Sequence, residues 1–224
     1  MHKDRARDFS EGSILKHLIA FSWPMFFGNF LQALYNTVDT FWVGRFLGTE
    51  ALAAVSASFP IVFFLVSLII GVGIATTILV SQYYGAKDEQ GLKRAINTSL
   101  FLMTVSALVV TAIGILFYKP IFKLVHLPES LWADAGTYLV IFLSGLVLTF
   151  LYNGLSAIMR GFGDSLTPLY FLAIATVINI ILDPLFILGV GPIPKMGVAG
   201  VAWATVLAQG PAIIRSLAGR IPFA

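Results

Sequence analysis

The chain has 224 residues, of which 58% are hydrophobic and only 11% are charged, with a net charge of +3 and no cysteine. Soluble domains carry about 25% charged residues, so this composition excludes a water-soluble globular protein. The lack of cysteine excludes disulfide bonds and thiolate metal sites, and the small positive charge does not indicate a nucleic-acid partner. The sequence predicts an all-α integral membrane protein in contact with lipid.

Six long apolar stretches follow one another along the chain. Each is about as long as, or longer than, the roughly 18–20 residues that a membrane-spanning helix needs. Residues 1–12 mix both charge signs and are expected to form a cytoplasmic tail, and residues 218–224 a short C-terminal tail. The predicted spans cover residues 13–44, 50–84, 91–117, 132–158, 166–189 and 196–217.

The basic residues predict the orientation of these spans, because cytoplasmic segments of membrane proteins carry an excess of Lys and Arg. With the N-terminus inside, most of the 14 basic residues fall on the cytoplasmic side. We therefore expect a protein of the cell membrane with both termini in the cytoplasm. The basic residues on the inner side are Lys3, Arg5, Arg7, Lys16, Lys87, Lys93, Arg94, Arg160, Arg215 and Arg220, and those on the outer side are Arg45, Lys119, Lys123 and Lys195.

Two of the predicted spans contain an acidic residue. Asp39 lies in "YNTVDTFWVG" of the first span, and Asp183 lies in "VINIILDPLFILG" of the fifth. A carboxylate at the centre of a bilayer helix costs roughly 2.5–3.5 kcal/mol on insertion scales. No Lys or Arg occurs in the interior of any predicted span. Two acids without a basic partner indicate a site for a cation or a proton.

The neighbours of Asp183 extend this hypothesis. Asn179 precedes it by one helical turn, so the two side chains share one helix face. Pro184 removes a backbone N–H and crowds the carbonyl of Ile180, which predicts a bent helix with a free carbonyl oxygen. Pro24 is expected to kink the first span in the same way. The fifth span therefore offers an oxygen-rich niche.

Polar side chains of other spans can add to this niche. Asn36, Asn153 and Thr205 each lie within a predicted span, but each can equally serve as a hydrogen bond between helices. The 19 phenylalanines and four tryptophans can line a cavity that holds an organic cation by its ring faces, or they can face lipid.

The segment "RGFGD" contains the Gly-x-Gly-Asp signature of intramembrane aspartyl proteases. Such an enzyme needs a second, opposed aspartate that shares a proton with the first. In this sequence the motif lies between two predicted spans, so Asp164 or Ser165 is expected to cap the following helix. A turn is the simpler interpretation, and an aspartyl protease is the alternative.

In its wider context the same segment, "LSAIMRGFGDSLTPLYF", resembles the Arg-Gly-x-Gly-Asp-[Ser/Thr]-x-x-Pro loop of the multidrug and toxic compound extrusion (MATE) family. The matching residues are Arg160, Gly161, Gly163, Asp164 and Pro168. Other segments resemble further helices of the family in the same order. They are "WPMFFGNFLQALYNTVDTFWVGRFLGTEALAAVS", "GVGIATTILVSQYYGAKD", "NIILDPLFI" and "GVAGVAWATVLAQ".

The resemblance implies a transporter rather than an enzyme, without a cofactor, that exports small organic and often cationic or aromatic compounds in exchange for H⁺ or Na⁺. It implies a fold of two six-helix lobes around a central cavity. It also implies an ion-coupling site in the first lobe, with Na⁺ the only candidate metal. Carried over by motif, that site comprises Asp39, Asn153, Asn179, Asp183 and Thr205.

The resemblance covers about residues 13–209, which correspond to the first lobe alone. The final segment, "GPAIIRSLAGRIPFA", does not resemble the family's continuation. Transport by rocking of one lobe against another needs a second six-helix lobe. The sequence therefore predicts the N-terminal lobe of a secondary transporter, and the alternative is a membrane fragment that transports nothing.

Overall fold

The computed structural model of the chain describes residues 13–218, so the expected tail at 1–12 and the final residues 219–224 lie outside the described part. Within the described part, every regular element is a helix. The long elements are α1 (Ile14–Phe46), α2 (Gly48–Gly85), α3 (Glu89–Leu124), α4 (Trp132–Ser144), α5 (Leu146–Gly161), α6 (Leu166–Leu188) and α7 (Val198–Ala218), and a 3₁₀ turn, Glu129–Leu131, precedes α4.

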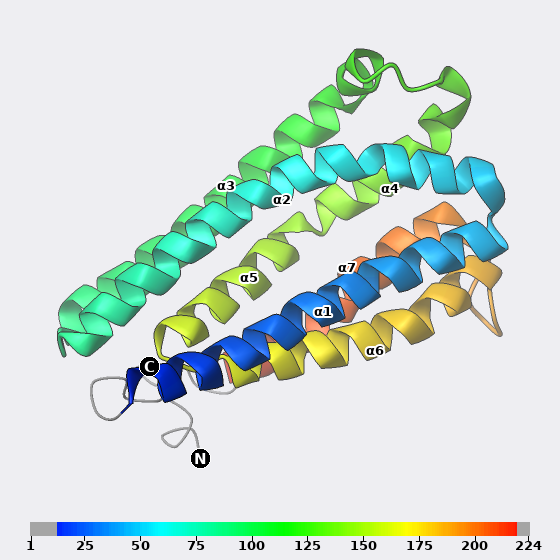
Figure 1. Cartoon of the computed structure of the whole chain (residues 1–224). Coiled ribbons are helices and arrows are strands. Elements are labelled where there is room, and N and C mark those ends of the chain that lie inside the picture. The colour runs from blue at the N-terminus through cyan, green and yellow to red at the C-terminus, as the bar shows by residue number, and fades with distance from the viewer. Residues whose placement is uncertain (1–12, 219–224) are drawn as a thin grey trace.

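The helices form two groups with α4 and α5 between them (Figure 1). In one group α6 packs against both α1 and α7, and in the other α2 packs against α3. The α4 helix contacts α7, and α5 contacts α2 and α3. The turns after α2 and α5 lie at the same end of the molecule as the start of α1 and the end of α7 (Figure 1).

The fourth predicted span is a bent pair of helices and not the single helix expected over 132–158. The axes of α4 and α5 differ by 47°, and the break falls at Gly145. A Cβ atom at Gly145 would collide with the side chain of Val206 on α7. At the end of α4, the carbonyl of Leu143 accepts a 2.9 Å hydrogen bond from the Thr111 hydroxyl of α3. Neighbouring helices therefore stabilise a bend that contains no proline.

Three of the helices, α2, α3 and α6, are each long and apolar enough to cross a membrane, and the bent pair adds a fourth if it counts as one span. The α1 helix has 33 residues and α7 has 21. The helices α1 and α7 do not meet the same criterion within the described part of the chain. The six membrane crossings therefore remain a prediction.

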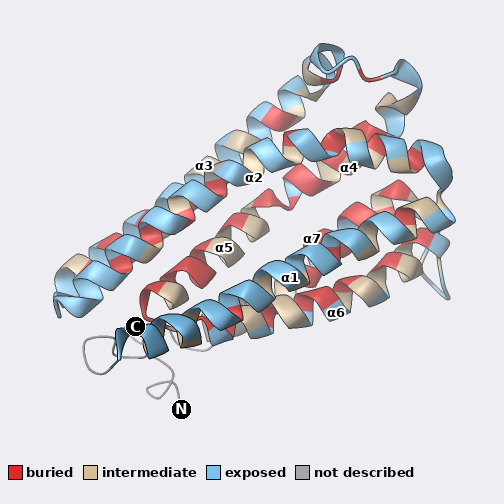
Figure 2. Cartoon of the chain, in the orientation of Figure 1, coloured by how far each residue is buried: buried red, intermediate tan, exposed pale blue. Residues whose placement is uncertain are grey.

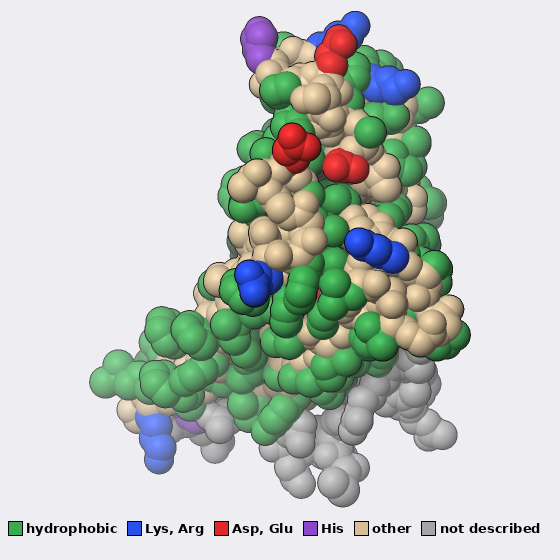
Figure 3. Space-filling view, turned by 90° about the vertical axis from the view of Figure 1, so that its right-hand side faces the viewer, with side chains coloured by type: hydrophobic (Ala, Val, Ile, Leu, Met, Phe, Trp, Pro, Cys, Tyr) green, Lys and Arg blue, Asp and Glu red, His purple; other side chains and the backbone are tan. Residues whose placement is uncertain are grey.

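The exposed surface of the helices is largely hydrophobic. Figure 2 shows mostly exposed residues on α1, α2 and α3 and many buried ones on α4 and α5. Figure 3 views the end that carries the α1–α2 turn, where several charged side chains gather above a hydrophobic flank. Exposed large apolar side chains are the surface that a helix in contact with lipid needs.

Candidate ion-coupling site

The site begins on α6, where two polar side chains are fully buried. Asn179 and Asp183 both have 0% exposure, and the Asn179 amide donates a 3.3 Å hydrogen bond to one carboxylate oxygen of Asp183. The i, i+4 spacing places them on one face of the helix. Pro184 lies inside α6 directly after Asp183, so the carbonyl of Ile180 lacks its usual helical donor.

Two further helices add to the same site. Asp39 of α1 lies near the Asp183 carboxyl group and the Asn179 amide. The hydroxyl of Thr205 on α7 donates a 3.4 Å hydrogen bond to Asp39 and lies 3.1 Å from the carbonyl of Val201. Four of the residues predicted from the sequence are therefore brought together by α1, α6 and α7.

The site has more buried oxygen atoms than hydrogen-bond donors. One carboxylate oxygen of Asp39, one of Asp183, the amide oxygen of Asn179 and the hydroxyl of Tyr35 are buried, and none has a hydrogen-bond partner among the described residues. A buried polar atom without a partner is costly. The arrangement can therefore take up a proton or a small cation, since either would satisfy oxygens that the helices leave free.

Asn153 makes a different contact. Its amide group, on α5, donates a 2.8 Å hydrogen bond to the carbonyl of Thr149 one turn earlier. The four clustered residues lie on other helices, and the contacts described for Asn153 do not include them. Its membership in the coupling site therefore remains a prediction from the family resemblance.

Two tyrosines belong to the surroundings of the site and were not anticipated. Tyr35 precedes Asp39 by one turn of α1 and lies near Thr205, but its buried hydroxyl has no hydrogen-bond partner among the described residues. Tyr138 of α4 lies within electrostatic range of both carboxyl groups. The i, i+4 spacing between Tyr35 and Asp39 predicts that the two side chains share one face of α1. No local pattern in the sequence relates Tyr138 to the acids.

The loop motif between α5 and α6 has a structural role at Asp164. One carboxylate oxygen of Asp164 accepts hydrogen bonds from the backbone N–H groups of Leu166 (3.1 Å) and Thr167 (2.9 Å), and the other accepts from the Thr167 hydroxyl. Ser165 makes no capping hydrogen bond, so Asp164 caps α6. It lies roughly 28 Å along α6 from Asp183, at 1.5 Å per residue, which is too far for the shared-proton pair of an aspartyl protease.

The other residues of the motif fit the same turn. Gly163 has φ of 82°, a conformation that favours glycine. A Cβ atom at Gly161 would collide with Val80 of α2, so the small residue allows close packing. The carbonyl of the buried Pro168 accepts a 3.5 Å hydrogen bond from the Tyr152 hydroxyl. Arg160 is half-buried in the last turn of α5.

Comparisons with known proteins agree on one family. The family model of MatE matches residues 24–185. The chain is 39% identical over 213 residues to the probable multidrug resistance protein YpnP of Bacillus subtilis, which covers 95% of this chain and 47% of that protein. It is 31% identical to the FAD transporter of Shewanella oneidensis, over 84% of this chain and 42% of that protein. The chain thus spans about half the length of the curated relatives it matches.

Solved structures with a similar fold belong to the same family. A crystal structure of MATE in the bent conformation superposes with a TM-score of 0.86 at 28% sequence identity. The match covers 94% of this chain and 46% of the other. The arrangement of the helices is therefore one half of a fold that is known from solved structures.

Proposed function

Because the chain belongs to the multidrug and toxic compound extrusion (MATE) family of membrane transporters, we propose that it is the N-terminal lobe of an exporter driven by H⁺ or Na⁺. The coupling ion binds among Asp39, Asp183, Asn179 and Thr205. The substrates are small organic compounds with aromatic rings, in keeping with relatives named for multidrug resistance and for FAD transport.

The cluster of unsatisfied oxygens is the observation that carries this proposal. Two carboxyl groups from different helices lie near one another, and no Lys or Arg occurs in the interior of α1, α6 or α7 around them. Like charges at such a distance repel strongly. Taking up H⁺ or Na⁺ removes this repulsion, so the ion stabilises a closer approach of α1 to α6 than the empty site does.

Ion binding is coupled to export if the lobe with an ion bound and the lobe with an empty site differ in their affinity for substrate. The chain provides one lobe, and alternating access in this type of fold needs a second lobe that rocks against the first. The described start of α1 and end of α7 share one end of the molecule with the turns after α2 and α5 (Figure 1), and the distribution of basic residues predicts that this end faces the cytoplasm.

The proposal is tested by joining residues 1–209 to the second lobe of a related transporter and reconstituting the hybrid in liposomes. Efflux of an aromatic drug is measured with an imposed pH gradient or an imposed Na⁺ gradient, and the gradient that drives efflux identifies the ion. Asp39→Asn and Asp183→Asn are each expected to abolish ion-driven efflux, because an amide can neither take up and release the proton nor supply the negative charge that balances Na⁺.

Asp164→Asn is the matched control, because it makes the same change at an acid outside the site. Wild-type efflux in both Asp39→Asn and Asp183→Asn would show that the acids are structural. A hybrid that inserts in the membrane but moves no substrate under either gradient would favour the non-transporting fragment.

A further inference from the structure

Two buried oxygen atoms beside the acids share a feature that the proposed coupling site does not explain. They belong to Tyr35 of α1, which is 7% exposed, and to Gln209 of α7, which is half-buried. The Tyr35 hydroxyl and the side-chain oxygen Oε1 of Gln209 are each buried, and neither has a hydrogen-bond partner among the described residues. Gln209 is not among the site residues predicted from the sequence.

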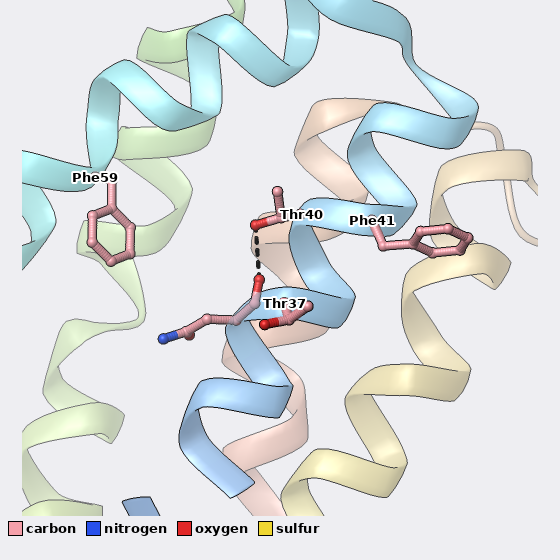
Figure 4. Close-up of a pocket in the computed structure, with 5 residues that line it drawn as sticks. Thr37, Thr40, Phe41 and Phe59 are labelled. Carbon is pink, nitrogen blue, oxygen red and sulfur yellow. Dashed lines mark hydrogen bonds between the residues drawn. The ribbon is translucent and has the colours of Figure 1, made fainter. Parts of the chain in front are cut away.

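Other hydroxyl groups in this part of α1 are satisfied within the helix itself. Thr37 donates to the carbonyl of Ala33 and Thr40 donates to the carbonyl of Asn36, each at 2.8 Å. Figure 4 shows the second of these bonds. A tyrosine hydroxyl stands too far from its own backbone for such a bond, so Tyr35 needs a partner on another helix. A buried hydroxyl without a partner costs free energy.

Helix geometry places Tyr35 and Gln209 at the same level of the molecule. Thr205 of α7 donates to Asp39 of α1, and these two helices run in opposite directions (Figure 1). Tyr35 lies one turn of α1 before Asp39. Gln209 lies one turn of α7 after Thr205. Each is therefore roughly 6 Å along its helix from this contact, toward the same end of the molecule and on the helix face that makes the contact.

The two groups are chemically complementary. A phenolic hydroxyl can donate, whereas an amide oxygen only accepts, so a hydrogen bond from Tyr35 to Gln209 would satisfy both. An ion bound between Asp39 and Asp183 removes the repulsion that separates α1 from α6. Because α7 packs against α6, an approach of α1 to α6 also brings Tyr35 closer to Gln209.

We propose that Tyr35 and Gln209 form a latch that closes when the coupling ion binds, in which the Tyr35 hydroxyl donates to Oε1 of Gln209 and holds α1 against α7. Both act through the position of α1, so they are positioning residues. The latch rests on the proposed function, because it sets the ion affinity of the same site. It also links ion binding to the arrangement of the helices, since its hydrogen bond exists only when the ion is bound.

The test is a double-mutant cycle on the purified full chain in lipid nanodiscs. Tyr35→Phe removes the hydroxyl, Gln209→Met removes the amide at similar size, and a third variant carries both changes. Tm is measured over a series of Na⁺ concentrations and pH values. Each single change should shift the curve of Tm to about threefold to tenfold higher Na⁺ or H⁺ concentration, the effect of losing one hydrogen bond.

The double variant distinguishes a latch from two independent contacts. It should show the shift of one single variant, because both changes break the same hydrogen bond. At neutral pH without Na⁺, each single variant should be at least as stable as wild type, since each change removes a buried group that has no partner. A merely structural role would lower Tm under all conditions.

Two control variants make the same changes outside the site. Tyr83→Phe and Gln82→Met alter exposed residues near the end of α2 and should leave the curves unaltered. Circular dichroism of every variant verifies that the helices are formed.

Additive shifts in the double variant, or a wild-type curve in either single variant, would overturn the latch. So would coupling between the two changes that is already present without the ion, since the bond would then exist in both arrangements. A wild-type chain whose Tm responds to neither Na⁺ nor pH would reject the proposed function and the latch with it. Failure of the latch alone is therefore distinguishable from failure of the proposed function.

Discussion

The hydroxyl of Thr205 lies 3.4 Å from a carboxylate oxygen of Asp39, across a separation of 166 residues. This contact joins the last described helix of the lobe to the first at the level of the two acids. Asn179 and Asp183 of α6 complete the cluster. The site therefore depends on the correct packing of three helices, and each of its members can be tested separately.

Thr205→Val keeps the shape of the side chain and removes its hydroxyl group. Addition of Na⁺, or acidification, is expected to raise the Tm of the purified chain, because a ligand that binds the folded state stabilises it. Thr205→Val should reduce that increase, because one of the oxygens near the ion is lost. Thr176→Val is the control, since among the described residues the Thr176 hydroxyl bonds only the carbonyl of Leu172 in its own helix. Equal responses to Na⁺ and pH in both variants would exclude Thr205 from the site.

Asp183→Asn is expected to remove the dependence of Tm on Na⁺ and on pH. The neutral amide costs less to bury than an unpaired carboxylate, so the variant should be more stable than wild type without Na⁺ at neutral pH. Differential scanning fluorimetry over a series of Na⁺ concentrations and pH values measures both effects. A variant that is less stable than wild type under all these conditions would argue against an unpaired charge at this position.

Asp164→Ala removes the cap of α6 and should cost about 1 kcal/mol of stability. The response of Tm to Na⁺ should stay at the wild-type value, because the cap lies far along α6 from the acids. Ser165→Ala changes the adjacent residue, which makes no capping hydrogen bond, and serves as the comparison. Loss of the response to Na⁺ in a folded Asp164→Ala protein would contradict this assignment.

Gly145→Ala should destabilise the chain by roughly 1–3 kcal/mol, the usual cost of overpacking, because the added methyl group meets Val206. Combining it with Val206→Ala should recover part of the loss. Gly71→Ala has nothing within 4 Å of the new Cβ atom and should be neutral or slightly stabilising. Additive losses in the double variant, measured by unfolding in denaturant, would show that the two residues do not interact at the bend.

The sequence was sufficient to place the helices, because long apolar runs are the dominant signal in a membrane protein. It located the two acids of the site for the same reason, since a charged residue inside such a run is conspicuous. The bend at Gly145 could not be found in this way. Its partner Val206 is distant in sequence, and an isolated glycine is common in membrane helices.

The surroundings of the acids were only partly predictable. Tyr35 shares a helix face with Asp39, so the spacing contained the information. Tyr138 lies within electrostatic range of both acids because α4 packs against α7, and this packing is not encoded in any local pattern. Asn153 differs from the tyrosines. The family resemblance predicts it as a residue of the ion-coupling site, but its described hydrogen bond stays within its own helix.

The short connection between α1 and α2 has a consequence for biosynthesis. A single residue, Leu47, separates the two helices, and Gly48 with φ of 86° permits the abrupt reversal. The α2 helix has a mean hydropathy of 2.6 in its most apolar window, whereas α1 carries Asn29, Gln32, Asn36 and Asp39 and partitions into lipid less readily. We therefore expect α1 to leave the translocon together with α2 as a helical hairpin, so that a nascent chain ending before α2 would fail to integrate.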